Sequence, residues 1–141
     1  MKKLLIGFAA AAASILVIGV PALAENAIYL NCECQTASDD VGGGETCFDF
    51  SAIVDVDKHT LQQSTTTRGN FGPHPAEISV TLIGADARGG PDGKDDSWED
   101  RLSINRVSGA YSWVMTFHTP PPPDIRTYYA GMCTRVEGPK F

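Results

Sequence analysis

The feature that most constrains this chain is the alternation of apolar and polar residues through most of its length after the first 24 residues. Successive side chains of a β-strand point to opposite faces, so a period of two predicts strands with one buried face. No window beyond the first 24 residues shows helical periodicity over three turns. The expected strands lie at 28–34, 48–56, 60–64, 78–82, 102–105, 111–117 and 127–136.

These segments predict an all-β domain, a single antiparallel meander of six or seven strands that is closed or nearly closed as a barrel. A β-sandwich is the alternative arrangement. Turns are expected at 57–59 and at 107–109, where Gly109 suits the left-handed position of a tight hairpin. Three longer loops are expected at 36–46, at 86–100 and at 119–124, the last with four consecutive prolines.

Residues 1–24 have the three parts of a secretory signal peptide. Lys2 and Lys3 give a cationic start, residues 4–20 carry no charge, and small residues surround the expected cleavage position. The apolar run is short for a transmembrane helix of ~20 residues. We therefore expect a leader over 1–24, a single β domain over 25–141, no stable membrane anchor after cleavage, and a periplasmic or secreted location.

The four cysteines, Cys32, Cys34, Cys47 and Cys133, all lie behind the leader. An even number of cysteines in an exported protein predicts two disulfides rather than a metal site, which would need further ligands. Cys32 and Cys34 cannot easily pair with each other along an extended strand. Two connectivities remain, Cys32–Cys133 with Cys34–Cys47, or Cys32–Cys47 with Cys34–Cys133, and either ties the first strand to the last.

The charge of the chain restricts its partners. It carries 17 acidic and 11 basic residues, a net charge of −6, and loss of the leader removes two lysines and no acid. Nucleic-acid binding is not expected, because phosphate affinity needs clustered Lys and Arg. The acidic balance favours a cationic partner, such as a basic protein.

No catalytic or cofactor-binding pattern stands out. A Gly-x-Ser-x-Gly motif is absent, the cysteines are expected to be oxidised, and the glycine run at 42–44 is followed by Glu45 where a phosphate loop has lysine. We therefore predict a non-enzymatic binding module without a cofactor. A small hydrolase that uses acidic loop residues is an alternative. The histidines, expected at the surface, are His59, His74 and His118.

The acidic loop at 86–100 is the best metal candidate, because calcium prefers several carboxylate oxygens on a flexible loop. Lys94 occupies a position that an EF-hand gives to an acid, so a solvated charged loop is the main interpretation and calcium binding the alternative. The candidate calcium ligands are Asp92, Asp95, Asp96, Glu99 and Asp100, and the last four are also the acids of the hydrolase alternative.

Five apolar residues are expected on the outer faces of their strands. If they cluster they form an apolar patch that would bind a partner, whereas scatter or cover by loops is the alternative. These residues are Ile53, Ile83, Val114, Tyr128 and Met132.

Three short segments, at 28–32, 103–109 and 129–133, resemble a set of small exported bacterial β-proteins of unknown function. The set shares a leading Leu-x-Cys, a hairpin of the form Ile-Asp/Asn-Arg-x-Thr/Ser-Gly and a closing cysteine. The resemblance implies that the outer cysteines, Cys32 and Cys133, pair with each other. Cys34 and Cys47 would then form the second bridge.

The chain is also similar to the periplasmic inhibitors of C-type lysozyme, which are small disulfide-bearing β-barrels with a Tyr-x-Cys entry and a Ser-Gly-x-x-Tyr loop. Here the segment from Tyr29 to Cys32 is one residue longer, and the segment from Ser108 to Tyr111 is one residue shorter. The similarity implies inhibition of a basic cell-wall hydrolase such as lysozyme as an alternative function. An acidic barrel has the right charge to face such an enzyme.

Overall fold

The computed structural model describes residues 26–67, 69–88, 97–119 and 123–138. The predicted signal peptide over 1–24 lies outside these residues. In the described part of the chain, no helix has the length and hydropathy needed to cross a membrane. The strands of this part are β1 (Ala27–Asp39), β2 (Phe50–Asp55), β3 (Thr60–Thr65), β4 (Gly69–Ile78), β5 (Leu82–Arg88), β6 (Trp98–Asn105), β7 (Ala110–Phe117) and β8 (Ile125–Val136).

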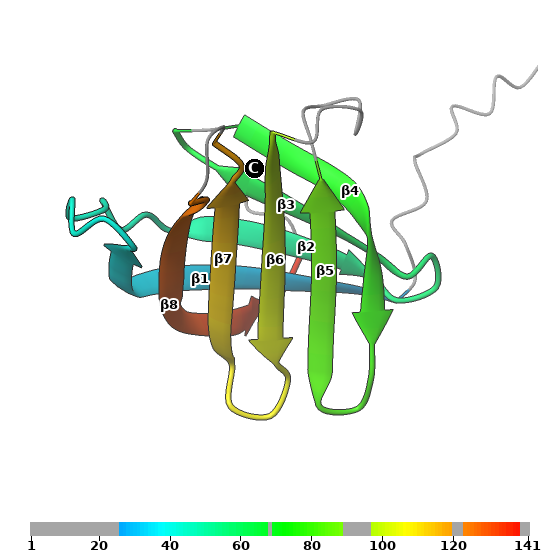
Figure 1. The fold of residues 1–141 in the computed structure, drawn as a ribbon. Helices are drawn as coiled ribbons and strands as arrows, with labels where there is room; N and C mark the ends of the chain where they lie inside the picture. The colour runs from blue at the N-terminus through cyan, green and yellow to red at the C-terminus, as the bar shows by residue number, and fades with distance from the viewer. Residues whose placement is uncertain (1–25, 68, 89–96, 120–122, 139–141) are drawn as a thin grey trace, which may run out of the picture.

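The strands form a closed antiparallel barrel in which each strand pairs with the next and β8 pairs with β1 (Figure 1). The predicted all-β meander and its closure into a barrel are confirmed, with eight strands in place of six or seven. Closure of this kind pairs the first and last strands and so leaves neither as an exposed edge.

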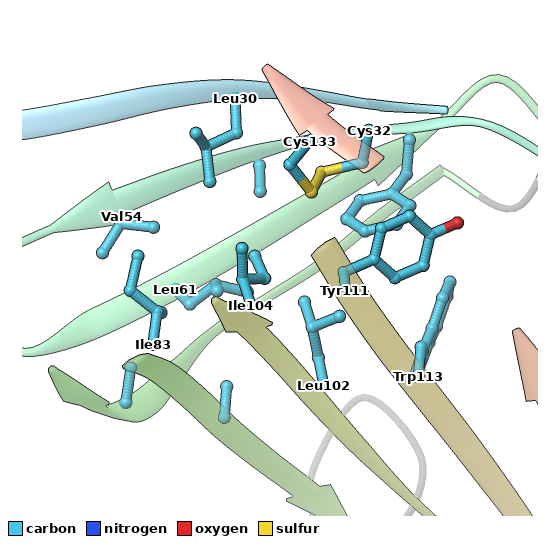
Figure 2. Packing of buried hydrophobic residues seen from close by; sticks show 14 of the residues in the cluster. Leu30, Cys32, Val54, Leu61, Ile83, Leu102, Ile104, Tyr111, Trp113 and Cys133 are labelled. Atoms are coloured by element: carbon cyan, nitrogen blue, oxygen red, sulfur yellow. A yellow bond between two sulfur atoms is a disulfide. The ribbon is translucent and has the colours of Figure 1, made fainter. Parts of the chain in front are cut away.

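Both disulfides are present, as Cys32–Cys133 and Cys34–Cys47. The first joins directly opposed residues of β1 and β8 inside the barrel, as Figure 2 shows. Its cysteines are 101 residues apart, and closing so long a loop stabilises a fold by ~4–5 kcal/mol in the chain-entropy description. Two disulfides are consistent with an extracellular or periplasmic location.

The seam between β1 and β8 also depends on a glycine. Gly131 lies opposite Cys34, next to a shift in register between Cys34 and Thr36. A Cβ atom on Gly131 would lie 1.9 Å from the carbonyl oxygen of Glu33, so a larger residue would push the two strands apart. The backbones of the first and last strands therefore meet at a point where only glycine fits.

The barrel interior is filled by side chains that alternate along the strands. An eight-stranded barrel is just wide enough for side chains from its walls to fill it. The aliphatic residues that Figure 2 labels in this core are Leu30, Val54, Leu61, Ile83, Leu102 and Ile104.

The prediction of a strand at 78–82 is wrong, because the chain forms a turn at 79–81 that separates β4 from β5. Ser79 builds this turn: its backbone N–H donates to the carbonyl oxygen of Leu82 (2.8 Å), and its hydroxyl oxygen accepts from the N–H of Leu82 (3.0 Å). The turn resets the phase of the alternation. Ile83 consequently points into the barrel and is 2% exposed, so its expected place in an outer patch is also wrong.

The connections alternate between the two ends of the barrel. Those from β1 to β2, β3 to β4, β5 to β6 and β7 to β8 leave at one end, which we name the loop end. The connections at 56–59, 79–81 and 106–109 leave at the other, which we name the turn end. The predicted turns at 57–59 and 107–109 both lie there, and Gly109 has the expected positive φ of 79°.

Candidate functional site

A cluster of aromatic rings lies inside the barrel, where the loop that leads into β2 joins its wall. Phe48 contacts Tyr129 and Trp113 edge-on, with ring centroids 4.9 and 5.5 Å apart. Phe50 contacts Trp113 at 5.5 Å and Tyr111 at 5.0 Å in the same way. Edge-to-face pairs of this kind are worth about 0.5–1.5 kcal/mol beyond the burial of their area. The cluster therefore anchors the incoming loop on the strands β7 and β8.

The loop at 40–49 is held against the barrel by more than its aromatic residue. Glu45 Oε1 accepts a hydrogen bond from the Tyr129 hydroxyl (2.8 Å), across 84 residues of sequence. Cys47 is bonded to Cys34 of β1. Asp39 Oδ1 accepts from the N–H groups of Val41 (3.0 Å) and Gly43 (2.9 Å). This loop, expected from residue 36, begins later because β1 continues to Asp39.

Asp100 is a buried acid on the inner face of β6 and is only 4% exposed. Burial raises the pKa of its carboxyl group to about 6, while the indole of Trp113 on β7 lowers it by a smaller amount. Oδ2 of Asp100 and Nε1 of Trp113 nevertheless lack a hydrogen-bond partner of normal geometry among the described residues. A buried acid of this kind takes up a proton, or receives a donor group, near neutral pH.

A second buried polar group, Gln63, lies on the inner face of β3. It is 2% exposed, and its amide Nε2 has no hydrogen-bond partner among the described residues. Nearly all buried polar atoms in folded proteins are hydrogen-bonded, and exceptions concentrate at functional sites. The sequence held a signal for this residue, since Leu61, Gln63 and Thr65 occupy successive inner positions of one strand.

The sequence around the loop at 40–49 is strongly acidic. The whole stretch between residues 4 and 57 contains no Lys, Arg or His. Asp49 Oδ1 accepts from the N–H of Cys34 (2.8 Å), which fixes this carboxylate beside β1. Two of the described acidic residues of this stretch, Asp55 and Asp57, lie at the turn end, and the others are Glu33, Asp39, Asp40, Glu45 and Asp49.

The expected calcium ligands fall mostly outside the described residues, where Asp92, Asp95 and Asp96 lie. Glu99 and Asp100 are neighbours on β6, and their side chains therefore point to opposite faces of the sheet. The described ranges contain no group of three or more His, Cys, Asp or Glu residues that could hold a metal ion. Calcium binding stays a prediction, but the two described acids do not share one site.

The expected outer patch is only partly assembled. Val114 and Tyr128 are directly opposed on β7 and β8, and Val114 lines a surface hollow of about 320 Å³. Ile53 is opposite Tyr29 on β1 instead, with β1 between it and β8. Met132 lies four residues from Tyr128, opposite Ala110. The barrel thus brings two of the five residues together, and their role in binding stays a prediction.

The histidines occupy three different environments. His59 is exposed in the turn between β2 and β3. His118 Nδ1 lies 3.0 Å from Asp124 Oδ2 at the exposed loop end. His74 is half-buried in β4, and burial lowers its pKa. The expected surface position is therefore confirmed for His59 and His118 but not for His74.

Comparisons of the chain with protein-family models, with curated proteins and with solved structures give no significant match.

Proposed function

We propose that this protein is a non-enzymatic binding module, exported to the periplasm or the cell exterior, that takes a cationic partner at the loop end of its barrel. The observation that carries the proposal is the fixed acidic loop at 40–49. Asp40, Glu45 and Asp49 lie in a stretch without a single basic residue. The Cys34–Cys47 bridge and the Tyr129 hydroxyl hold that loop in place.

The physical reason is that a loop with an excess of one sign of charge attracts the opposite sign over several ångströms. Such a field steers a cationic partner toward the site and raises the association rate. A loop that is ordered before binding also loses little conformational entropy when the partner arrives. The disulfide and the Glu45–Tyr129 hydrogen bond (2.8 Å) supply that order.

The test compares charge removal at the two ends of the barrel. We use residues 25–141 with intact disulfides and measure binding to a basic C-type lysozyme by calorimetry at low and high salt. Asp40→Asn, Glu45→Gln and Asp49→Asn together should weaken binding about tenfold, at roughly half a kcal/mol per exposed charge. Asn and Gln keep the carbonyl acceptors for the bonds of Asp49 and Glu45.

The matched control removes the same number of charges at the turn end, by Asp57→Asn, Glu77→Gln and Glu137→Gln. It should bind as the unchanged protein does at both salt concentrations. No binding to the basic probe, or equal weakening by the two triple variants, would contradict the proposal.

A narrower candidate is inhibition of a basic cell-wall hydrolase such as lysozyme. The acidic character of the fixed loop favours it, since C-type lysozymes that are basic have the complementary charge. Adding the mature domain to a cell-clearing assay should slow lysis in proportion to its concentration. If the domain binds lysozyme in the first test but lysis is unchanged at a large excess of domain, the proposed binding function stands and the proposed inhibition is rejected.

A further inference from the structure

The turn end of the barrel carries a second hollow, with a chemistry opposite to that of the loop end. Its volume is about 280 Å³, close to the lower limit for small-molecule pockets. Core side chains form its apolar floor, and two arginines lie at its rim. Among the described residues that line it there is no acid. The floor and rim residues are Ile28, Leu30, Ile83, Ile104, Arg106 and Arg135.

One exposed apolar side chain lines this hollow, and a second lies on the adjacent turn. Val107 lines it and is 80% exposed, and Val80, on the adjacent turn, is 87% exposed. The two turns lie next to each other along the lower edge of Figure 1. The backbone N–H of Arg106 donates to the carbonyl oxygen of Thr81 (2.8 Å), and its guanidinium donates to the carbonyl oxygen of Ser79. The two exposed valines therefore sit on turns that are fixed to each other.

Arg135 has an unusual position for a charged residue. It lies directly opposite Leu30, two residues after Cys133, and so follows the inward-facing positions of β8 to the end of the barrel. Its side chain is exposed and has no ion-pair partner in the described part of the chain. An inward position beside an apolar floor keeps its stem in contact with the barrel while the guanidinium stays in water.

We propose that the turn end binds a free single-chain amphiphile with an anionic head, its tail in the hollow and its head on Arg135 and Arg106. Guanidinium groups bind carboxylate and phosphate through paired hydrogen bonds. One nitrogen of the Arg106 guanidinium donates to the carbonyl oxygen of Ser79, and its other nitrogens remain to bind the anionic head. The apolar floor and Val107 remove the tail from water. An amphiphile whose tail fills this hollow is no longer part of a bilayer. The ligand is therefore a single free amphiphile molecule.

The test measures binding of laurate, below its micelle concentration, to residues 25–141 by calorimetry. We expect micromolar binding, which Arg135→Gln weakens about tenfold, the cost of losing one charge-assisted pair. Arg126→Gln is the matched control, because Arg126 is an exposed arginine at the other end of the same strand. It should leave laurate binding unchanged. Val107→Asp should weaken laurate binding at least as much as Arg135→Gln, by placing a carboxylate at the rim.

Three results would overturn the proposal. They are no laurate binding up to about 1 mM, equal effects of Arg135→Gln and Arg126→Gln, and sedimentation with phosphatidylglycerol vesicles in the absence of laurate binding. The last result would assign this end to a bilayer surface. All variants lie at exposed positions, and their melting temperatures report whether the fold is kept. The cationic-partner test at the loop end is independent of each of these outcomes.

Discussion

The turn end and the loop end fill the same barrel with different chemistry. At the turn end the inner positions are aliphatic, with Ile28, Val54, Leu61, Ile83 and Ile104. At the loop end the same faces of the strands carry polar groups, Gln63, Thr65, Asp100 and Thr127, beside apolar side chains such as Ala87 and Met115. Apolar burial of the first kind stabilises a fold directly, whereas buried polar atoms contribute only when they are paired. The comparison teaches that the turn end stabilises the fold by apolar burial alone. The loop end combines stabilising aromatic contacts with polar side chains, and Gln63 and Asp100 each have an atom without a hydrogen-bond partner among the described residues.

The largest effect on the free energy of unfolding should come from substitutions on β3, a strand that runs from the turn end to the loop end. Leu61→Ala removes a fully buried side chain at the turn end and should lower the free energy of unfolding by about 4 kcal/mol. Gln63→Met, two residues further, removes the unpartnered amide at the loop end and should change stability by less than about 1 kcal/mol. Urea denaturation measures both. Equal losses for the two variants would show that the ends are energetically alike.

A smaller effect should follow from removal of the loop-end bridge. Its cysteines are 13 residues apart, so Cys34→Ala with Cys47→Ala should cost up to about 3 kcal/mol. The change should be local: amide hydrogens of residues 40–49 exchange faster, while those of the turn at 106–109 keep their protection. Hydrogen exchange measures the difference. Faster exchange at both ends would mean that the barrel opens as a single unit.

The smallest effect concerns Asp100 and depends on pH. Its pKa is about 6 in the folded protein against 3.8 in the unfolded chain, so the folded state holds the proton more tightly. The free energy of unfolding should therefore fall as pH rises from about 4 to 6, by at most about 3 kcal/mol. Asp100→Asn should remove this loss.

In thermal denaturation, Asp100→Asn should accordingly be more stable than the unchanged protein by about 2 kcal/mol at pH 7.5 and no more stable at pH 4. Asp40→Asn, at an exposed loop position, is the matched control and should follow the unchanged protein at both pH values. A gain for Asp100→Asn that is the same at both pH values would mean that burial of the charge is not the cause.

The alternation of apolar and polar residues was sufficient to predict the barrel, because most strands have one solvent-facing and one buried face. It failed at β4, where Gly69, Gly72, Pro73 and Pro75 interrupt the pattern. That segment is a strand because β3 and β5 pair with it on both sides, with an irregularity opposite β3 that accommodates the extra residues. Pairing across the sheet, which no local pattern encodes, decides its structure.

The candidate site was less accessible to sequence reasoning. The sequence predicts Asp100 in a charged loop because acids surround it in sequence, yet β6 begins at Trp98 and the side chain of Asp100 points inward. Glu45 and Tyr129 are 84 residues apart, and only the closed barrel brings them into contact. Arg135 follows the inward positions of β8, a property that depends on the register of that strand with β1. Each of these relations requires the three-dimensional pairing of strands.

The pairing of Tyr29 with Val136 places the start of β1 beside the end of β8. A short linker between these neighbours would replace no ladder contact, and new termini cut in the turn at 79–81 would interrupt no strand. The barrel should thus tolerate circular permutation, because the pairing of its eight strands matters more than the order in which they follow one another in the chain.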